Sequence, residues 1–204
     1  ALGSVPRSLN DPATTNDVNI SGFLNMLIAA RDSKVSRFVY AASSSTYGDS
    51  ETLPKVEDKI GNPLSPYAVT KYVNELYAQL FARLNYLEVV GLRYFNVYGD
   101  RQPLKGQYAP VIGLFLKQYH ERKPLTVVGD GSQSRDFTHI SDVVEANILA
   151  SEVSHGFGEV YNIGYGSNYS IIDIANMISN DVKFIPSRIG EVQETLASNS
   201  KFKD

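Results

Sequence analysis

The sequence contains no cysteine among its 204 residues. This absence excludes disulfide bonds, thiolate nucleophiles and cysteine-ligated metals. Histidine is also scarce, since only His120, His139 and His155 are present. The three are scattered along the chain without the spacing of a metal site, so we predict no bound metal.

The sequence also lacks a large excess of either charge, and it has no long apolar run. The formal net charge is −3 and no block of lysine or arginine occurs, which argues against a nucleic-acid partner. No apolar run approaches the ~20 residues that a membrane helix needs. The opening ALGSVPRS does not have the pattern of a signal peptide. We therefore expect a cytoplasmic protein with no membrane partner.

The hydrophobic content of 43% allows a sizeable core. Buried, β-rich runs alternate with segments of helical periodicity, and a loop covers 43–66. Ser141 and Ser170 are the expected N-caps of the last two long helices. This alternation predicts an α/β fold with a doubly wound parallel sheet. We expect helices at 17–30, 66–84, 111–121, 140–150 and 170–179, and strands at 37–42, 87–93, 125–128, 159–163 and 182–185.

The clearest chemical signal is the pair Tyr67 and Lys71 in SPYAVTKYVNE. A spacing of four places both side chains on one helix face, about one turn apart. A cation ~4 Å from a phenol, at an effective dielectric of ~20, stabilises the phenolate by up to roughly 4 kcal/mol. The spacing therefore predicts a general base for alcohol oxidation.

The bare pattern Tyr-x-x-x-Lys is weak evidence, because it recurs at Tyr119 and Lys123. That second match ends a helix just before Pro124, and no serine-bearing strand end precedes it. The Tyr67 match follows a buried strand that ends in the serines of YAASSSTYGD. Ligands bind at the carboxyl ends of strands in α/β sheets, so the Tyr67 match is the candidate site.

The serine-rich strand end, the Tyr67 helix and the following LRYFNVYG strand together resemble the extended short-chain dehydrogenase/reductases that act on nucleotide sugars. Within that family, SVPRS and GNPLSPYAVTKY are similar to UDP-N-acetylglucosamine 4-epimerases. The resemblance implies a Rossmann-type sheet with a small mixed α/β C-terminal substrate lobe. It implies NAD as the cofactor, a UDP-sugar as the substrate, and a homodimer formed through the helices at 17–30 and 66–84.

The resemblance also implies catalytic roles. Tyr67 is the base that takes the proton from the sugar 4-hydroxyl, and Lys71 binds the nicotinamide ribose and lowers the pKa of the phenol. Ser43 hydrogen-bonds the reacting oxygen. Tyr94 lies against the nicotinamide, and Ala42 belongs to the same cofactor site. The Ser-Ser-Ser stretch has no carboxylate for dehydration or decarboxylation, which favours simple epimerisation at C4.

The substrate site implied by the resemblance is drawn from the whole chain. Arg135 contacts the nucleotide, while Asp136 and His139 fix that segment in place. Thr195 is small where relatives confined to unacetylated sugars carry a large aromatic residue, so an N-acetyl group has room. Gly3 and Ser4 are expected beside the sugar, Asn96 and Arg188 at the diphosphate, and Glu191 at the uridine ribose. Ser44 and Val111 complete the expected substrate site.

The glycine-rich turn that opens this family's fold is absent from the sequence. We therefore expect the sequence to be a portion of a longer protein that has about 80–100 further residues before it. The expected division assigns 1–105 and 136–163 to the NAD-binding domain, and 106–135 and 164–204 to the substrate lobe. Two alternatives to a UDP-N-acetylglucosamine or UDP-glucose epimerase stay open: a UDP-uronic acid 4-epimerase, and a non-catalytic nucleotide-sugar or dinucleotide sensor.

Overall fold

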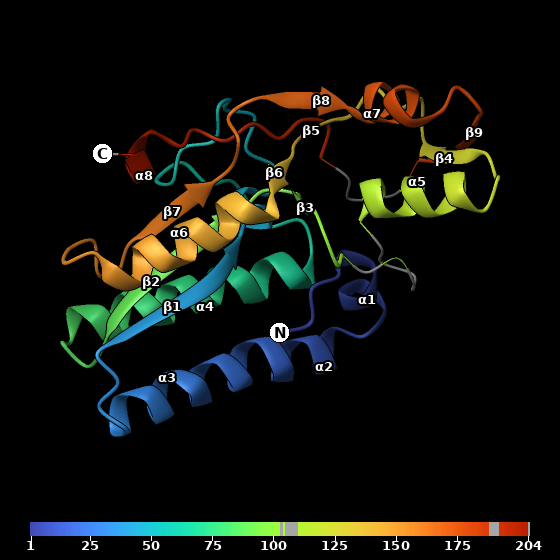
Figure 1. Cartoon of the computed structure of the whole chain (residues 1–204). Coiled ribbons are helices and arrows are strands. Elements are labelled where there is room, and N and C mark those ends of the chain that lie inside the picture. The colour runs from blue at the N-terminus through green and yellow to red at the C-terminus, as the bar shows by residue number, and fades with distance from the viewer. Residues whose placement is uncertain (103, 105–109, 188–191, 204) are drawn as a thin grey trace.

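The computed structural model describes residues 1–204 apart from 103, 105–109, 188–191 and 204. Helices and strands alternate along most of the chain (Figure 1). In chain order they are α1 Val5–Asn10, α2 Pro12–Asn16, the π-helical turn η1 Asp17–Ser21, α3 Gly22–Asp32, β1 Arg37–Ser43, the 3-10 helix η2 Ser44–Tyr47, α4 Pro66–Arg83, β2 Glu88–Tyr94, β3 Val97–Tyr98, α5 Val111–His120, β4 Leu125–Val128, β5 Ser134–Asp136, β6 Thr138–His139, α6 Ile140–Glu152, β7 Val160–Ile163, β8 Asn168–Ser170, α7 Ile171–Ile178, β9 Val182–Ile185 and α8 Ser200–Lys203.

The main sheet consists of three parallel strands in the order β1-β2-β7. Helices α3 and α4 lie on one side of this sheet and α6 lies on the other (Figure 1). The register pairs Ala42 with Arg93 and Ser43 with Tyr94, so β1 and β2 end side by side. This arrangement confirms the predicted Rossmann-type parallel fold, and it gathers the strand ends at one edge.

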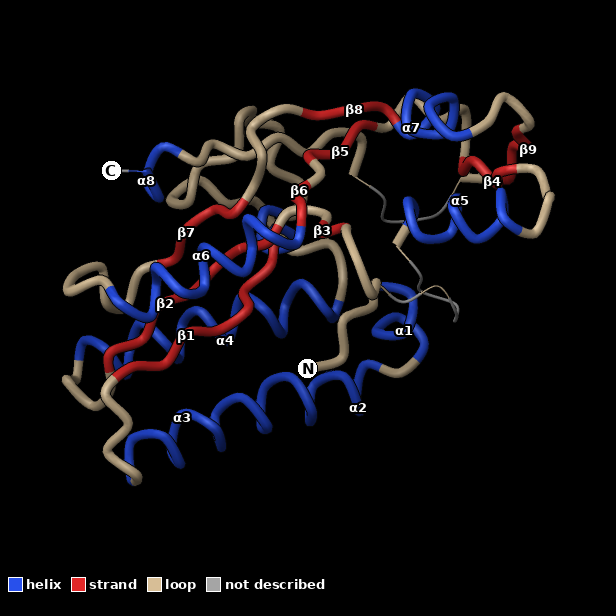
Figure 2. The backbone as a smooth tube through the Cα atoms, in the orientation of Figure 1, coloured by secondary structure: helices blue, strands red, loops and turns tan. Residues whose placement is uncertain are grey.

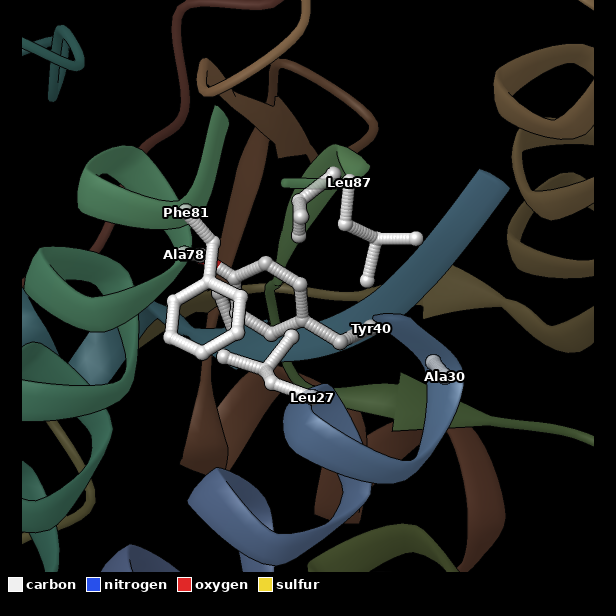
Figure 3. Packing of buried hydrophobic residues seen from close by; sticks show 8 residues of the cluster. Leu27, Ala30, Tyr40, Ala78, Phe81 and Leu87 are labelled. Carbon is white, nitrogen blue, oxygen red and sulfur yellow. The ribbon is translucent and has the colours of Figure 1, made fainter. Parts of the chain in front are cut away.

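The core between the sheet and the helices α3 and α4 is apolar. Leu27 and Val89 are fully buried, and Phe81 and Tyr40 are 7% exposed. Figure 3 shows the side chains of Leu27, Phe81, Tyr40 and Leu87 converging beside β1. Burying a side chain of this size contributes about 1.5–3 kcal/mol, so this contact holds α4 at a fixed distance from the sheet.

A second group of elements lies at the other end of the molecule (Figures 1 and 2). The strands β4 and β9 pair in parallel, while β5 and β8 pair antiparallel. Phe115, Leu125 and Val127 are fully buried in a cluster with residues of α7. Mixed strand directions agree with the expected small α/β lobe; the boundaries of the two domains remain a prediction.

The helical N-terminal region differs from expectation. The predicted helix at 17–30 begins with the π turn η1 and continues as α3 to Asp32. Two further helices precede it, and local signals start both. Ser4 caps α1 by accepting from Arg7 N, and Asp11 caps α2 by accepting from Thr14 N. A serine or aspartate N-cap with a proline in the first helical turn is a typical helix start, and no helix is predicted there from the sequence.

One of the two predicted N-caps is wrong. His139, not Ser141, caps α6, because the His139 ring nitrogen accepts from Ser141 N at 3.3 Å. Ser170 is confirmed as the cap of α7, since its hydroxyl accepts from Asp173 N at 3.1 Å. No helix in the described ranges combines the length and the apolar character needed to cross a membrane.

Candidate active site

Ser43 and Tyr67 meet at the edge of the sheet where β1 ends. Ser43 is the last residue of β1, and its buried hydroxyl accepts from Ser45 N at 3.2 Å. Tyr67 lies in the first turn of α4, which starts there because Ser65 accepts from Ala68 N at 3.1 Å and proline occupies the next position. The Tyr67 hydroxyl then donates to Ser43 Oγ at 3.4 Å. The structure thus brings together the two side chains for which the resemblance implies roles at the same sugar oxygen.

Lys71 lies one turn further along α4 and is 5% exposed. Its ammonium donates to the carbonyl oxygen of Ala41 at 2.8 Å and lies 6.0 Å from the centre of the Tyr67 ring. The two side chains share one helix face as predicted. The ammonium, however, is directed at the strand backbone and does not contact the phenol oxygen.

Burial is the largest influence on the pKa values of Tyr67 and Lys71. Burial raises the pKa of Tyr67 above its usual value, and the hydrogen bond with Ser43 opposes that rise. Burial lowers the pKa of Lys71, while the negative charge of Glu75 opposes that fall. The Lys71 ammonium donates to Ala41 O, and the role of Lys71 in lowering the phenol pKa stays a prediction.

A cavity of about 310 Å³ lies beside Ser43, a size that suits a small molecule. Ser43 and Ser44 line it from the end of β1 and from η2. Asn96, Arg135 and Thr195 line it from segments that are distant in sequence. Five of the predicted substrate residues thus share one cavity.

Hydrogen bonds fix the far wall of this cavity. Thr195 Oγ1 accepts from Asn96 Nδ2 at 3.3 Å and from Asp136 N at 3.3 Å. Arg135 donates to the carbonyl oxygens of Ser134 at 2.8 Å and Gln193 at 3.2 Å. A threonine hydroxyl and an asparagine amide therefore lie together on one wall of a cavity whose lining also includes the apolar side chains of Val5, Leu9 and Phe95.

Asp136 is the buried anchor of that wall and is fully inaccessible to solvent. Its carboxylate accepts from the backbone N–H groups of Tyr165 at 2.8 Å, Gly166 at 3.0 Å and Ala197 at 3.0 Å. These bonds fasten two segments to β5, the loop at Tyr165 and Gly166 and the chain at Ala197, which agrees with the fixing role expected for Asp136.

Several predicted site residues do not line the cavity. Gly3 is exposed, and the Ser4 hydroxyl caps α1. The Tyr94 hydroxyl donates to Asn147 Oδ1 of α6 at 3.0 Å, which keeps this ring beside α6. Val111 packs against the core of the second lobe, because it begins the amphipathic helix α5. Ala42 is buried within β1.

Two further predicted residues, Arg188 and Glu191, lie outside the described residues. The cavity also contains residues that we did not predict, among them Lys55, Tyr47 and Val192. Tyr47 lies two residues after Ser45 on the same loop, so its place in the sequence was a usable signal.

Lys55 carries a buried positive charge at this cavity and is 3% exposed. Its ammonium donates to the carbonyl oxygen of Ser50, and burial lowers its pKa while Glu194 opposes that shift. The Lys55 backbone N–H donates to Leu196 O at 2.7 Å. No signal in the sequence marks this lysine as a site residue. Its position at the cavity depends on pairing with a segment about 140 residues later in the chain.

A second cavity of about 290 Å³ includes Ala41, Lys71 and Asn74 in its lining. Asn74 is 2% exposed, and its Oδ1 has no hydrogen-bond partner among the described residues. An ammonium and a free amide oxygen suit a hydroxyl-bearing group such as a ribose. The residues present therefore fit the nicotinamide ribose of a dinucleotide, and the described residues contain no cluster of metal-binding side chains.

The parallel sheet, together with serine, tyrosine and lysine at its carboxyl edge, defines a Rossmann-type protein of the short-chain dehydrogenase/reductase class. The chain belongs to the NAD dependent epimerase/dehydratase family, whose sequence model matches residues 1–164.

Individual relatives agree with this family. The chain is 37% identical over 182 residues to a putative UDP-glucose 4-epimerase of Methanocaldococcus jannaschii, which covers 89% of this chain and 58% of that protein. It is 40% identical over 169 residues to a UDP-glucuronate 4-epimerase of Thermodesulfobacterium geofontis. This match covers 82% of this chain and 50% of that protein. It therefore spans less than two thirds of the length of these relatives.

The fold is also similar to a solved structure. This is the UDP-N-acetylglucosamine 4-epimerase of Methanobrevibacter ruminantium M1 in complex with UDP-N-acetylmuramic acid. The TM-score is 0.94 at 33% sequence identity, and the match covers 100% of this chain and 67% of that one.

Proposed function

We propose that this chain carries the catalytic residues and the sugar site of an NAD-dependent UDP-sugar 4-epimerase. The observation that supports this most directly is the hydrogen bond from Tyr67 to Ser43, a residue that lines the cavity of about 310 Å³. Family membership and the relatives named for this activity support it further. The proposed substrate lobe comprises 106–135 and 164–204.

In the proposed reaction, Tyr67 removes the proton from the sugar 4-hydroxyl while Ser43 holds the same oxygen. NAD⁺, when bound, supplies the hydride acceptor at C4 and then the hydride donor to the opposite face of the ketone. Lys71, together with Tyr67, would hold the nicotinamide ribose. Asn96 and Arg135 keep the nucleotide part of the substrate in place while the 4-keto sugar rotates about its diphosphate link.

We further propose that the enzyme accepts an N-acetylated hexose. Thr195 carries only a methyl and a hydroxyl group at the cavity wall, so the wall leaves space beside the sugar. Its hydroxyl is already bonded to Asn96 and Asp136, which keeps the side chain against the wall and away from the cavity centre.

A UDP-uronic acid is the second candidate substrate. Lys55 supplies the cation that such a substrate requires, because a buried ammonium lines the same cavity as Ser43. A carboxylate at C6 would form a charge-assisted hydrogen bond with it. The relative named UDP-glucuronate 4-epimerase supports this candidate too.

An NMR assay of the full-length protein distinguishes these candidates. UDP-N-acetylglucosamine, UDP-glucose and UDP-glucuronic acid are incubated separately without added reductant, and the 4-epimer is monitored. Formation of the galacto epimer of the N-acetyl sugar is the expected result. Turnover of the uronic acid alone would favour the second candidate, to which Lys55 supplies the cation. Silence with all three, despite bound NAD, would leave the non-catalytic sensor.

We also propose a homodimer formed through α3 and α4. The outer face of α4 carries Val69, Leu76 and Leu80, which are 45%, 48% and 36% exposed. Their spacing of seven and four places them on one stripe, opposite the face that bears Lys71. Leu76→Glu should convert a sedimenting dimer into a monomer. A wild-type protein that sediments only as a monomer would contradict this proposal.

A further inference from the structure

A buried ion pair joins α4, the helix that carries Tyr67 and Lys71, to the neighbouring strand β2. Arg93 donates through Nε and Nη2 to the two carboxylate oxygens of Glu75, at 2.9 Å and 2.7 Å. The two side chains are 3% and 7% exposed. A buried pair of this kind adds little stability compared with apolar residues of the same size, so stability alone does not account for it. Its two-pronged geometry fixes direction as well as distance.

The pair joins the two elements that carry the reaction. Tyr67, Lys71 and Glu75 follow one another at intervals of four, so all three lie on one face of α4. Arg93 lies on β2 opposite Ala42, one position before the pairing of Ser43 with Tyr94. A bond between Glu75 and Arg93 therefore sets the position of the Tyr67 face relative to the strand end that carries Ser43.

The same pair holds the loop after Ser43. The Thr46 hydroxyl donates to Glu75 Oε1 at 3.3 Å, and the Arg93 guanidinium lies 4.8 Å from the centre of the Tyr47 ring. Thr46 is fully buried, and Tyr47 is 2% exposed. Both residues belong to η2, whose first residues line the cavity. Helix, strand and loop thus converge on one ion pair.

We propose that Glu75 and Arg93 are positioning residues that hold Tyr67 and Ser43 in hydrogen-bonding contact. This inference rests on the proposed function, because it assigns the pair to the same reaction. Glu75 also opposes the effect of burial on the pKa of Lys71, so the pair supports the cation of the site as well as its geometry.

The test is the double variant Glu75→Leu/Arg93→Met in the full-length protein. Replacing both charges by apolar groups avoids an unpaired buried ion, so the variant should stay folded, with a Tm close to that of the wild type. We expect kcat to fall about 100-fold, as for a misplaced catalytic group, while the Kd for the UDP-sugar and KM stay within about threefold. Wild-type kcat in the folded variant would overturn the proposal, and so would a loss confined to KM.

A matched control is available on the same two strands. Arg37 and Glu88 form an ion pair at 2.9 Å across the opposite ends of β1 and β2. The variant Glu88→Leu/Arg37→Met should keep the wild-type kcat. If the double variant Glu75→Leu/Arg93→Met does not fold, Arg93→Lys is tested in its place. Lysine keeps the positive charge but cannot form the two-pronged bond with Glu75. The same loss of kcat is expected for Arg93→Lys, and an unchanged kcat would overturn the proposal.

A second readout does not depend on turnover. The ¹³Cζ resonance of Tyr67, assigned with Tyr67→Phe, should shift when Ser43→Ala is introduced into the wild type, because the hydrogen bond is lost. In the Glu75→Leu/Arg93→Met background, Ser43→Ala should no longer shift it. An equal shift in both backgrounds would refute the positioning role. A wild type that turns over no UDP-sugar would refute the proposed function instead, and the resonance alone would then decide the positioning role.

Discussion

Asp136→Asn tests whether one buried carboxylate fastens the wall of the sugar cavity. The substitution preserves the shape of the side chain but replaces one acceptor oxygen by an NH₂ donor. If the amide oxygen keeps the bonds to Gly166 and Ala197, the N–H of Tyr165 faces another donor. Losing a charge-assisted hydrogen bond costs about 1.5–3 kcal/mol, and a buried unsatisfied donor adds about 1–3 kcal/mol. We expect a total loss of roughly 3 kcal/mol in the free energy of unfolding.

Calorimetry of the full-length protein measures this loss. At about 2–4 °C per kcal/mol for a chain of this size, Tm should fall by roughly 6–12 °C. Asp142→Asn is the control, because Asp142 is exposed and accepts from the Ser141 hydroxyl at 3.2 Å; its Tm should change little. A Tm for Asp136→Asn within ~2 °C of the wild type would refute the reasoning. It would mean that the loop at Tyr165 and Gly166 and the segment at Ala197 are held by other contacts.

Four further outcomes are expected. Tyr67→Phe should keep its affinity for the UDP-sugar but lose about 10²–10⁴-fold in kcat; full activity would remove Tyr67 from the mechanism. Because the Ser43 bond lowers the pKa of Tyr67 and the base acts when deprotonated, Ser43→Ala should move the rise of the pH–rate profile to higher pH; a shift to lower pH would contradict this assignment. Thr195→Tyr should reduce kcat/KM for UDP-N-acetylglucosamine more than for UDP-glucose, and equal losses would count against the acetyl pocket. Gly48→Ala should displace the loop after the serines and lower both Tm and kcat. Gly48 has φ 53°, and an added Cβ would lie 1.8 Å from Asn62 O. An unchanged Tm would disprove this clash.

The sequence by itself determined the local part of the site. The expected strand at 37–42 and helix at 66–84 correspond to β1 and α4, because an apolar run and a serine–proline helix start act over a few residues. The interval between Tyr67 and Lys71 then placed both side chains on one helix face. The family resemblance added the partner Ser43, and the packing of α4 against β1 brought it into contact with Tyr67.

Only the tertiary structure decided which distant residues meet. Asn96 and Thr195, 99 positions apart, form one wall, and Lys55 enters the same cavity by pairing with the chain near Leu196. The direction of the Lys71 ammonium likewise depends on where the Ala41 carbonyl lies. Periodicity and capping encode elements because their energies are local. Contacts across the sheet depend on how the packed helices and the parallel register place whole elements, and no interval along the chain records that placement.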